Sequence, residues 1–214
     1  MAKRSRGWAV ALIIFLVLLA DQSLKFWVKT HMVLHDSIRI TDWFYLFFTE
    51  NNGMAFGIEL FDKLFLTLFR MAAVIGLFWY VSRIMTKSST RNGYLFCIAL
   101  IIAGAMGNII DCLFYGLVFN QSSGQLAVFL PDAGGYGSFF YGKVVDMLYF
   151  PIIDTYWPSW MPFVGGESLV FFRPIFNLAD ASISVGIFIL LLFYRKDLSE
   201  GSTSKIIPEA PETP

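Results

Sequence analysis

Residues 94–114 read YLFCIALIIAGAMGNIIDCLF, an apolar run that carries an amide at Asn108 and a carboxyl at Asp111 near its end. The run matches the ~20 residues that cross a bilayer as a helix. Polar and ionisable side chains inside such a helix are costly and are functional candidates by default. The stretch therefore predicts a membrane-spanning helix with a polar site near one end.

Three other apolar runs of similar length lie at about residues 8–28, 64–84 and 175–194. The chain is 57% hydrophobic and only 15% charged, against roughly 25% charged residues in an ordinary soluble domain. We therefore expect an all-α membrane protein in which residues 1–196 form one domain of four transmembrane helices. No A-x-A-like cleavage site follows the first run, so we interpret that run as an uncleaved anchor.

The positions of lysine and arginine predict the orientation. Basic residues precede the first run, connect the second to the third and follow the fourth: Lys3, Arg4, Arg6, Arg83, Lys87, Arg91, Arg195 and Lys196. The positive-inside rule makes these flanks cytoplasmic, so both termini lie inside and residues 29–63 and 115–174 lie outside. Residues 197–214, rich in Ser, Thr, Glu and Pro, are predicted to form a disordered cytoplasmic tail. The net charge is zero, and no basic block indicates nucleic acid as a partner.

The two outer segments have different compositions. Residues 37–49 are rich in β-branched and aromatic side chains and predict paired strands, a small β-type cradle outside the membrane. Residues 121–138 are rich in Gly and Ser and predict a flexible loop. Residues 149–172 are strongly aromatic, as is typical of headgroup depth, so we expect this surface loop to lie on the bilayer.

In this orientation, the polar residues of three runs gather in the outer third of the bilayer. They are Asp21 and Lys25 in the first run, Asn108 and Asp111 in the third, and Asn177 and Asp180 in the fourth. Residues three apart share one face of a helix, so two helices each present an amide beside a carboxyl. Another carboxyl, Asp146, follows Val144 and Val145 at the predicted surface. We therefore expect two or three carboxyl groups to meet at a boundary between water and lipid.

Two carboxyl groups a few Å apart in a low dielectric cannot both ionise, so one pKa rises and the other falls. The ionised group can take a proton from water, while the protonated group polarises a scissile carbonyl and then supplies the leaving amine. Asparagine side chains can hold the pair or the developing oxyanion. This chemistry is peptide hydrolysis without a metal or any other cofactor.

Other interpretations remain open for these residues. Asp21 and Lys25 can form a simple ion pair at a helix end, and Asp111 can be a structural anchor. Asp146 and Asp180 can serve a structural or proton-relay role.

Several other polar side chains have plainer interpretations. Arg70 is predicted to extend toward the outer interface. His31 and His35 lack the Glu of zinc peptidases, and Ser182 and Ser184 lack a basic partner. Cys97 and Cys112 lie too far apart on one helix to form a disulfide, and we expect small buried side chains.

Five short motifs occur in order along the chain. They are DQxxK (Asp21, Gln22, Lys25), NxGxAF (Asn51, Gly53, Ala55, Phe56), GNxxD (Gly107, Asn108, Asp111) followed by Gly116, VVD (Val144, Val145, Asp146) and FNxAD (Phe176, Asn177, Ala179, Asp180). In these motifs the sequence resembles lipoprotein signal peptidase, or signal peptidase II, a bacterial family of aspartic intramembrane endopeptidases. Each motif alone is weak, but five in order relative to four runs form a strong match.

The resemblance implies an endopeptidase that removes the signal peptide of diacylglyceryl-modified prolipoproteins just before the lipidated cysteine. It implies Asp146 and Asp180 as the catalytic pair. Substrate-binding or supporting roles would fall to Asp21, Lys25, Asn51, Gly53, Asn108, Asp111 and Asn177. The implied location is the bacterial inner membrane, with the site near the outer face and membrane lipid as a partner. We expect a monomer without metal or cofactor.

The sequence departs from the family pattern in two places. The family has an Arg directly after GNxxD, where this chain has Cys112, so that contact is absent or is supplied by Arg173 or Lys143. The segment from Gly116 to Lys143 is also much longer than the usual link.

A small proton-coupled membrane carrier is the alternative function, because paired Asp and Asn side chains also serve ion pathways. The sequence shows no internal repeat, and its polar residues stay on one side of the midplane. A membrane scaffold that docks partners through its aromatic outer loop is a third possibility, which leaves the carboxyls inside the spans unexplained.

Overall fold

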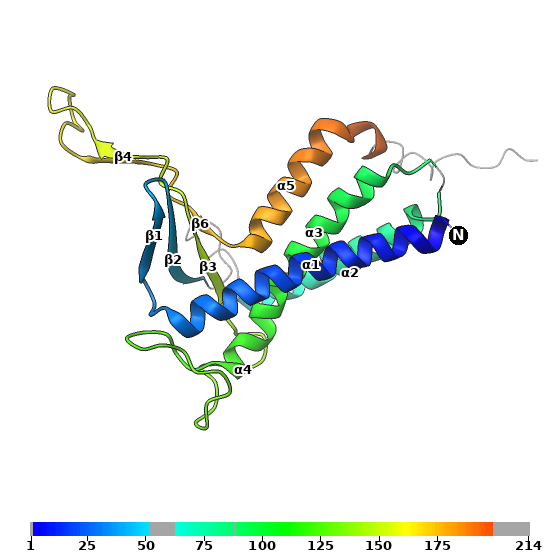
Figure 1. The fold of residues 1–214 in the computed structure, drawn as a ribbon, viewed down its shortest axis with the longest axis horizontal. Helices are drawn as coiled ribbons and strands as arrows, with labels where there is room; N and C mark the ends of the chain where they lie inside the picture. Colours follow the sequence, from blue (N-terminus) through cyan, green and yellow to red (C-terminus); the bar gives the residue numbers. More distant parts are fainter. Residues whose placement is uncertain (1, 52–62, 88, 199–214) are drawn as a thin grey trace, which may run out of the picture.

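The computed structural model describes residues 2–51, 63–87 and 89–198, which form a helical bundle with a small sheet at one end (Figure 1). The helices of the bundle are α1 (Ala2–His31), α2 (Lys63–Ile84), α3 (Asn92–Ile110) and α5 (Leu178–Phe193). At the sheet end, α3 continues as a π-helical turn, η1 (Asp111–Tyr115), and a short helix, α4 (Gly116–Val118).

Within the described residues, three helical stretches are long and apolar enough to cross a membrane: Ser5–His31, Lys63–Ile84 and Asn92–Val118. These stretches match the first three predicted spans. The fourth apolar helix, α5, has only 16 residues, against the ~20 of a full crossing. A count of four spans therefore stays a prediction.

The fourth helix begins three residues after the approximate start predicted at Ile175. Ile175 and Phe176 form a strand, β6, and the helix begins at Leu178. Asn177 is its N-cap, because its side chain accepts a hydrogen bond of 2.8 Å from the backbone N–H of Asp180. Such a cap satisfies one of the free N–H groups of the first turn, so the amide of Asn177 determines where α5 begins.

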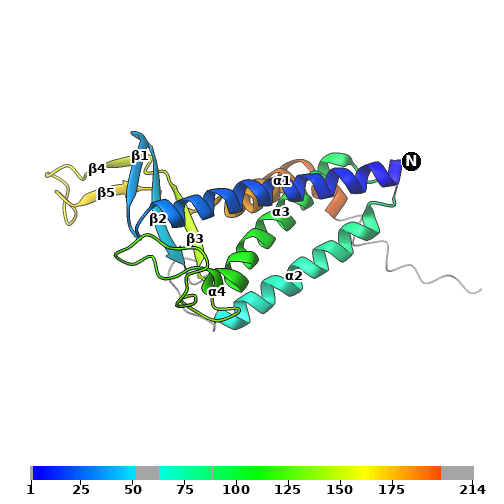
Figure 2. The same ribbon diagram turned by 60° about the horizontal axis from the view of Figure 1, so that its bottom comes forward.

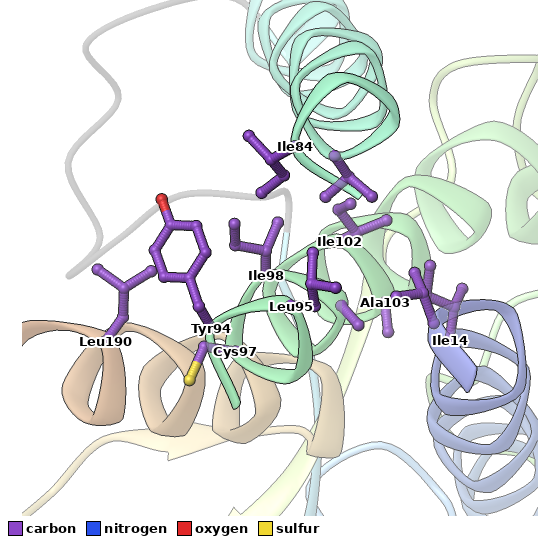
Figure 3. Packing of buried hydrophobic residues seen from close by; sticks show 12 residues of the cluster. Ile14, Ile84, Tyr94, Leu95, Cys97, Ile98, Ile102, Ala103 and Leu190 are labelled. Carbon is purple, nitrogen blue, oxygen red and sulfur yellow. The ribbon is translucent and has the colours of Figure 1, made fainter. Parts of the chain in front are cut away.

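Helix α3 forms the centre of the bundle. In Figure 3 it lies between α1, α2 and α5, and its residues Leu95, Ile98, Ile102 and Ala103 are packed among theirs. By contrast, large apolar side chains on α1 and α2 face outward, with Phe15 59% and Phe69 64% exposed. Exposed apolar faces of this extent indicate contact with lipid.

A four-stranded antiparallel sheet in the order β1-β2-β3-β6 closes the end of the bundle away from the N-terminus (Figure 1). Its strands are β1 (Ser37–Thr41), β2 (Phe44–Asn51), β3 (Val144–Tyr149) and β6 (Ile175–Phe176). The strand pairing expected within residues 37–49 is confirmed as β1 and β2. The all-α class is too narrow for the described residues, because the sheet also contains β3 and β6.

A second, two-stranded sheet is formed by β4 (Ile153–Tyr156) and β5 (Ser168–Phe171). This hairpin extends beyond the main sheet and away from the helices in both ribbon views (Figures 1 and 2). Its large aromatic side chains are uncovered, with Trp160 78% exposed. The expectation that these aromatic side chains lie on the bilayer stays a prediction.

The segment between α4 and β3 folds back against the end of α3. Gly142 donates a hydrogen bond of 2.9 Å from its N–H to the carbonyl of Cys112, and a Cβ at this position would lie 2.0 Å from the carbonyl oxygen of Asp111. Ser122 and Ala127 are buried. Residues 121–138 form the predicted loop, and the buried side chains of Ser122 and Ala127 anchor it against the rest of the protein. Its flexibility stays a prediction.

The close approach of α3 and α5 requires glycine. A Cβ on Gly104 would lie 2.2 Å from the carbonyl oxygen of Ala179, so Gly104→Ala must push the start of α5 away from α3. We expect this substitution to destabilise the protein by about 1–3 kcal/mol, as overpacking does. The measurement is thermal unfolding of the purified protein in detergent.

The matched control is Gly76→Ala on α2, where a Cβ would have no atom within 4 Å. We expect the control to keep the melting temperature of the natural protein. Equal melting temperatures for the two variants would contradict the tight packing of α3 on α5.

Candidate active site

Asp146 and Asp180 are brought together by the antiparallel pairing of β3 with β6. In this register Leu148 lies opposite Phe176, so β6 leads directly from the middle of the sheet into α5. Asp146 lies two residues before Leu148, and Asp180 lies in the first turn of α5. The sheet and the helix thus each present one carboxyl at the same junction.

Two asparagine side chains connect the two carboxyls. Asn177 donates a hydrogen bond of 2.7 Å to Oδ1 of Asp146, and Asn108 donates one of 2.7 Å to Oδ1 of Asp180. Asn177 also donates to Oδ1 of Asn108 at 3.1 Å. Asp146, Asn177, Asn108 and Asp180 therefore form one continuous hydrogen-bonded network across β3, α3 and α5.

The environment of Asp146 favours its protonated form. Burial, followed by the charge of the nearby Asp180 carboxyl, raises the pKa of Asp146 to about 7, against opposing hydrogen bonds from Asn177 and Asn51. A carboxyl with such a pKa can hold a proton near neutral pH and release it to a substrate. The pair can therefore hold a proton on one carboxyl beside an ionised partner.

A fully buried cation, Lys25, lies next to this network. Its Nζ forms ion pairs with Asp111 at 2.7 Å and Asp21 at 3.0 Å, and donates to Oδ1 of Asn108 at 2.9 Å. All three charged side chains are at most 1% exposed. Burial of charges is tolerated only when they are paired and hydrogen-bonded, as they are here.

The two anions around Lys25 also hold the backbone that carries the catalytic candidates. Asp21 accepts a hydrogen bond of 2.9 Å from the N–H of Ala179, next to Asp180. Asp111 accepts one of 3.3 Å from the N–H of Val145, next to Asp146. These contacts fit the structural interpretation of Asp21 and Asp111, and substrate contacts by them stay predictions.

Gln22 belongs to the site, although the sequence predicted no role for it beyond its place in the DQxxK motif. Its Nε2 donates to Oδ1 of Asp111 at 2.9 Å and to Oδ2 of Asp21 at 3.1 Å, while its Oε1 accepts from the hydroxyl of Tyr115 at 3.2 Å. Asp111 and Tyr115 begin and end the π-helical turn, a type of distortion that is frequent at functional sites.

The basic side chain that contacts Cys112 is Arg70, and not Arg173 or Lys143 as the sequence suggested. Nη1 of Arg70 on α2 lies 3.9 Å from Sγ of Cys112, whereas Lys143 pairs with Glu50 and Arg173 is exposed. The interpretation of Arg70 as a side chain extending to the outer interface stays a prediction. Both Cys97 and Cys112 are free and buried, as expected.

The remaining candidates fall outside this network or outside the described residues. Asn51, the last residue of β2, hydrogen-bonds Asp146. Gly53 lies outside the described residues. The hydroxyl of Ser182 donates to the carbonyl of Leu100 at 2.9 Å, and His31 stacks on Trp27. Among the residues that the structure describes, no group of three His, Cys, Asp or Glu side chains is arranged to hold a metal ion.

Comparison with known proteins shows which family the chain resembles. The profile of the family described as Signal peptidase (SPase) II matches residues 13–195. A lipoprotein signal peptidase of Porphyromonas gingivalis is 46% identical over 97% of this chain and 96% of its own length. A lipoprotein signal peptidase of Amoebophilus asiaticus is 34% identical over 90% of this chain and 80% of its own length.

Two solved structures, both described as bacterial membrane enzymes determined by the in meso method, share the fold. One has a TM-score of 0.58 at 24% identity and covers 88% of this chain and 94% of its own. The other has a TM-score of 0.57 at 23% identity and covers 95% and 94%. With a family profile that spans most of the chain and relatives at this identity, the chain belongs to the signal peptidase II family of membrane proteases.

Proposed function

We propose that this protease removes the signal peptide of diacylglyceryl-modified prolipoproteins by cutting just before the lipidated cysteine, with Asp146 and Asp180 as the catalytic pair. One observation carries the proposal. The two carboxyls come from different elements and join one network through Asn177 and Asn108. The curated relatives bear the name lipoprotein signal peptidase, which supports a prolipoprotein as the substrate.

The raised pKa of Asp146 suggests which carboxyl holds the proton. Ionised Asp180 takes a proton from water as the water oxygen bonds to the scissile carbonyl carbon, and Asp146 gives its proton to the carbonyl oxygen. The resulting tetrahedral diol collapses: Asp180 returns its proton to the leaving amide nitrogen, the C–N bond breaks, and Asp146 recovers the proton of the hydroxyl. Each carboxyl thus regains its starting state.

The position of the site suits a substrate anchored by lipid. The pair lies where the apolar helices end and the sheet begins (Figure 1). The diacylglyceryl group of a prolipoprotein holds the scissile bond near headgroup depth. We propose a multi-pass protein of the bacterial inner membrane, with cytoplasmic termini and the site near the outer face. It works as a monomer, with the main sheet as a cradle for the substrate.

The carrier alternative is not favoured, because the family is a peptidase family. The polar network is also confined to the sheet end of the described helices, whereas a carrier needs polar groups near the bilayer midplane.

The catalytic pair is tested by Asp146→Asn and Asp180→Asn. We expect each variant to lower the cleavage rate by about 10³-fold or more, because the pair acts as a unit. The assay uses purified protein, a lipidated prolipoprotein peptide and EDTA. The control is Asp42→Asn, which removes a carboxyl that is 84% exposed and pairs with Arg39 at the sheet surface. Near-normal cleavage by either active-site variant would reject the pair.

The pH dependence of cleavage follows from the protonated carboxyl. Below its pKa of about 7, Asp146 holds the proton that the reaction uses, and above it the proton is lost. We therefore expect kcat/KM to fall as the pH rises through about 7, approaching tenfold per pH unit. A flat profile from pH 6 to 9 would contradict the assignment of the proton to Asp146.

The same pKa predicts a change in stability. Because the folded protein binds this proton more tightly than the unfolded chain, stability decreases by about 1.4 kcal/mol per pH unit from about pH 4 to pH 7. Asp146→Asn removes this titration. The melting temperature of the variant minus that of the natural protein should therefore be larger at pH 8 than at pH 5. Thermal unfolding at both values tests the sign, and a constant difference would contradict it.

A further inference from the structure

A second cluster of buried charges lies beside the catalytic network, and the proposed reaction does not use it. Glu50 on β2 is 4% exposed and pairs with Lys29 through Oε1 and with Lys143 through Oε2, the latter at 3.1 Å. Ser122 accepts a hydrogen bond of 2.9 Å from Lys29 and donates one of 2.9 Å to Glu50. Both oxygens of the Glu50 carboxylate therefore have partners.

Aromatic rings complete the surroundings of the two lysines. Nζ of Lys29 lies 5.0 Å from the ring centre of Tyr136 and 5.4 Å from that of Phe119, and Lys143 lies 5.5 Å from that of Tyr136. The Tyr136 hydroxyl also accepts a hydrogen bond of 2.6 Å from the N–H of Lys143. Cations over ring faces are stabilised when they are removed from water. Burial alone would raise the pKa of Glu50, but the two lysines lower it, so the Glu50 carboxyl is held in its charged form.

The cluster joins three parts of the chain that are far apart in sequence. Lys29 comes from the last turns of α1 and Glu50 from β2, while Ser122, Tyr136 and Lys143 come from the long segment between α4 and β3. Lys143 directly precedes β3, the strand that carries Asp146. The long segment thus supplies one half of an ion-pair cluster.

The register of the sheet connects this cluster to Asp146. Glu50 lies between Thr49, which is opposite Asp146, and Asn51, which hydrogen-bonds Asp146. Successive side chains of a strand point to opposite faces, so Glu50 anchors β2 from one face while Asn51 holds Asp146 on the other. A shift of Glu50 would move both neighbours.

We propose that the Lys29–Glu50–Lys143 cluster is a positioning device for the catalytic pair. It fixes the end of β2, so that Asn51 keeps the Asp146 carboxyl in the position where Asn177 also hydrogen-bonds it. The inference rests on the proposed function. Glu50, Lys29 and Lys143 are positioning residues, which act through Asn51 and β3. The segment from 119 to 143 has the role of completing this cluster.

The test compares Glu50→Gln with the natural protein and with Asp42→Asn, an exposed carboxyl in the turn between β1 and β2, outside the strands of the proposed cradle. We expect Glu50→Gln to lower kcat by about 10–100-fold, as sub-ångström to ångström misplacement does, with KM within about twofold. Asp42→Asn should keep both constants. Cleavage of a lipidated prolipoprotein peptide gives kcat and KM, and thermal unfolding at the assay pH shows that each variant is folded.

A rescue separates positioning from a general loss of structure. Glu50→Gln leaves Lys29 as a buried charge without its anion, which is more costly than removing both charges. We therefore expect the double variant Lys29→Gln/Glu50→Gln to recover melting temperature while its kcat stays lowered, because the ion pairs that fix β2 are still absent. A double variant with the kcat of the natural protein would overturn the positioning role. Lys143→Arg, which keeps the charge at the partly exposed edge of the cluster, should retain kcat within about threefold.

Each outcome decides one of the two proposals. A folded Glu50→Gln variant with the kcat of the natural protein would overturn the positioning role. If Glu50→Gln fails to fold, Lys143→Met takes its place, because Glu50 keeps its pair with Lys29; unchanged kcat there would overturn the inference too. A natural protein that leaves the lipidated peptide intact would overturn the proposed function, and the inference with it.

Discussion

The charge of Lys25 is the constraint on which the rest of the structure depends. An ammonium group with no exposed surface must be compensated, and Asp21, Asp111 and Asn108 provide this from α1 and α3. The same two carboxylates bind the backbone of α5 and β3. One buried cation therefore links two long helices to the two elements that carry the catalytic candidates.

Polar groups in this protein are arranged in layers along α1. Asp21, Lys25 and Lys29 follow each other at intervals of four, so they share one face of the helix. The first two serve the network of Asp146 and Asp180, and the third serves the cluster of Glu50. On another face of α1, large apolar side chains such as Leu12, Phe15 and Leu19 are exposed, as lipid contact requires. A single helix thus separates a lipid-facing side from a charged side.

The sequence predicted those parts of the fold that depend on local composition. Hydropathy located the three long helices, and intramembrane polar residues located the candidate site. The strand β3 was not predicted, because VVDMLY is a short apolar stretch whose partner, β2, lies about a hundred residues earlier. The contact of Arg70 with Cys112 and the pair of Lys29 with Glu50 also depend on the folded arrangement. Hydropathy gave only an approximate start for the fourth apolar helix, and the N-cap at Asn177 sets its first residue at Leu178.

The shortness of α5 has a consequence for the surrounding membrane. Sixteen residues rise about 24 Å, less than the ~30 Å of hydrocarbon in a typical bilayer. If α5 crosses the bilayer, the leaflets beside it must become thinner to match it, and hydrophobic mismatch of this kind deforms lipid at modest cost. Headgroups and water would then dip toward the first turn of α5, where Asp180 lies. A lipid-anchored peptide drifting sideways in the membrane would meet the carboxyls at a local depression, without being lifted out of its leaflet.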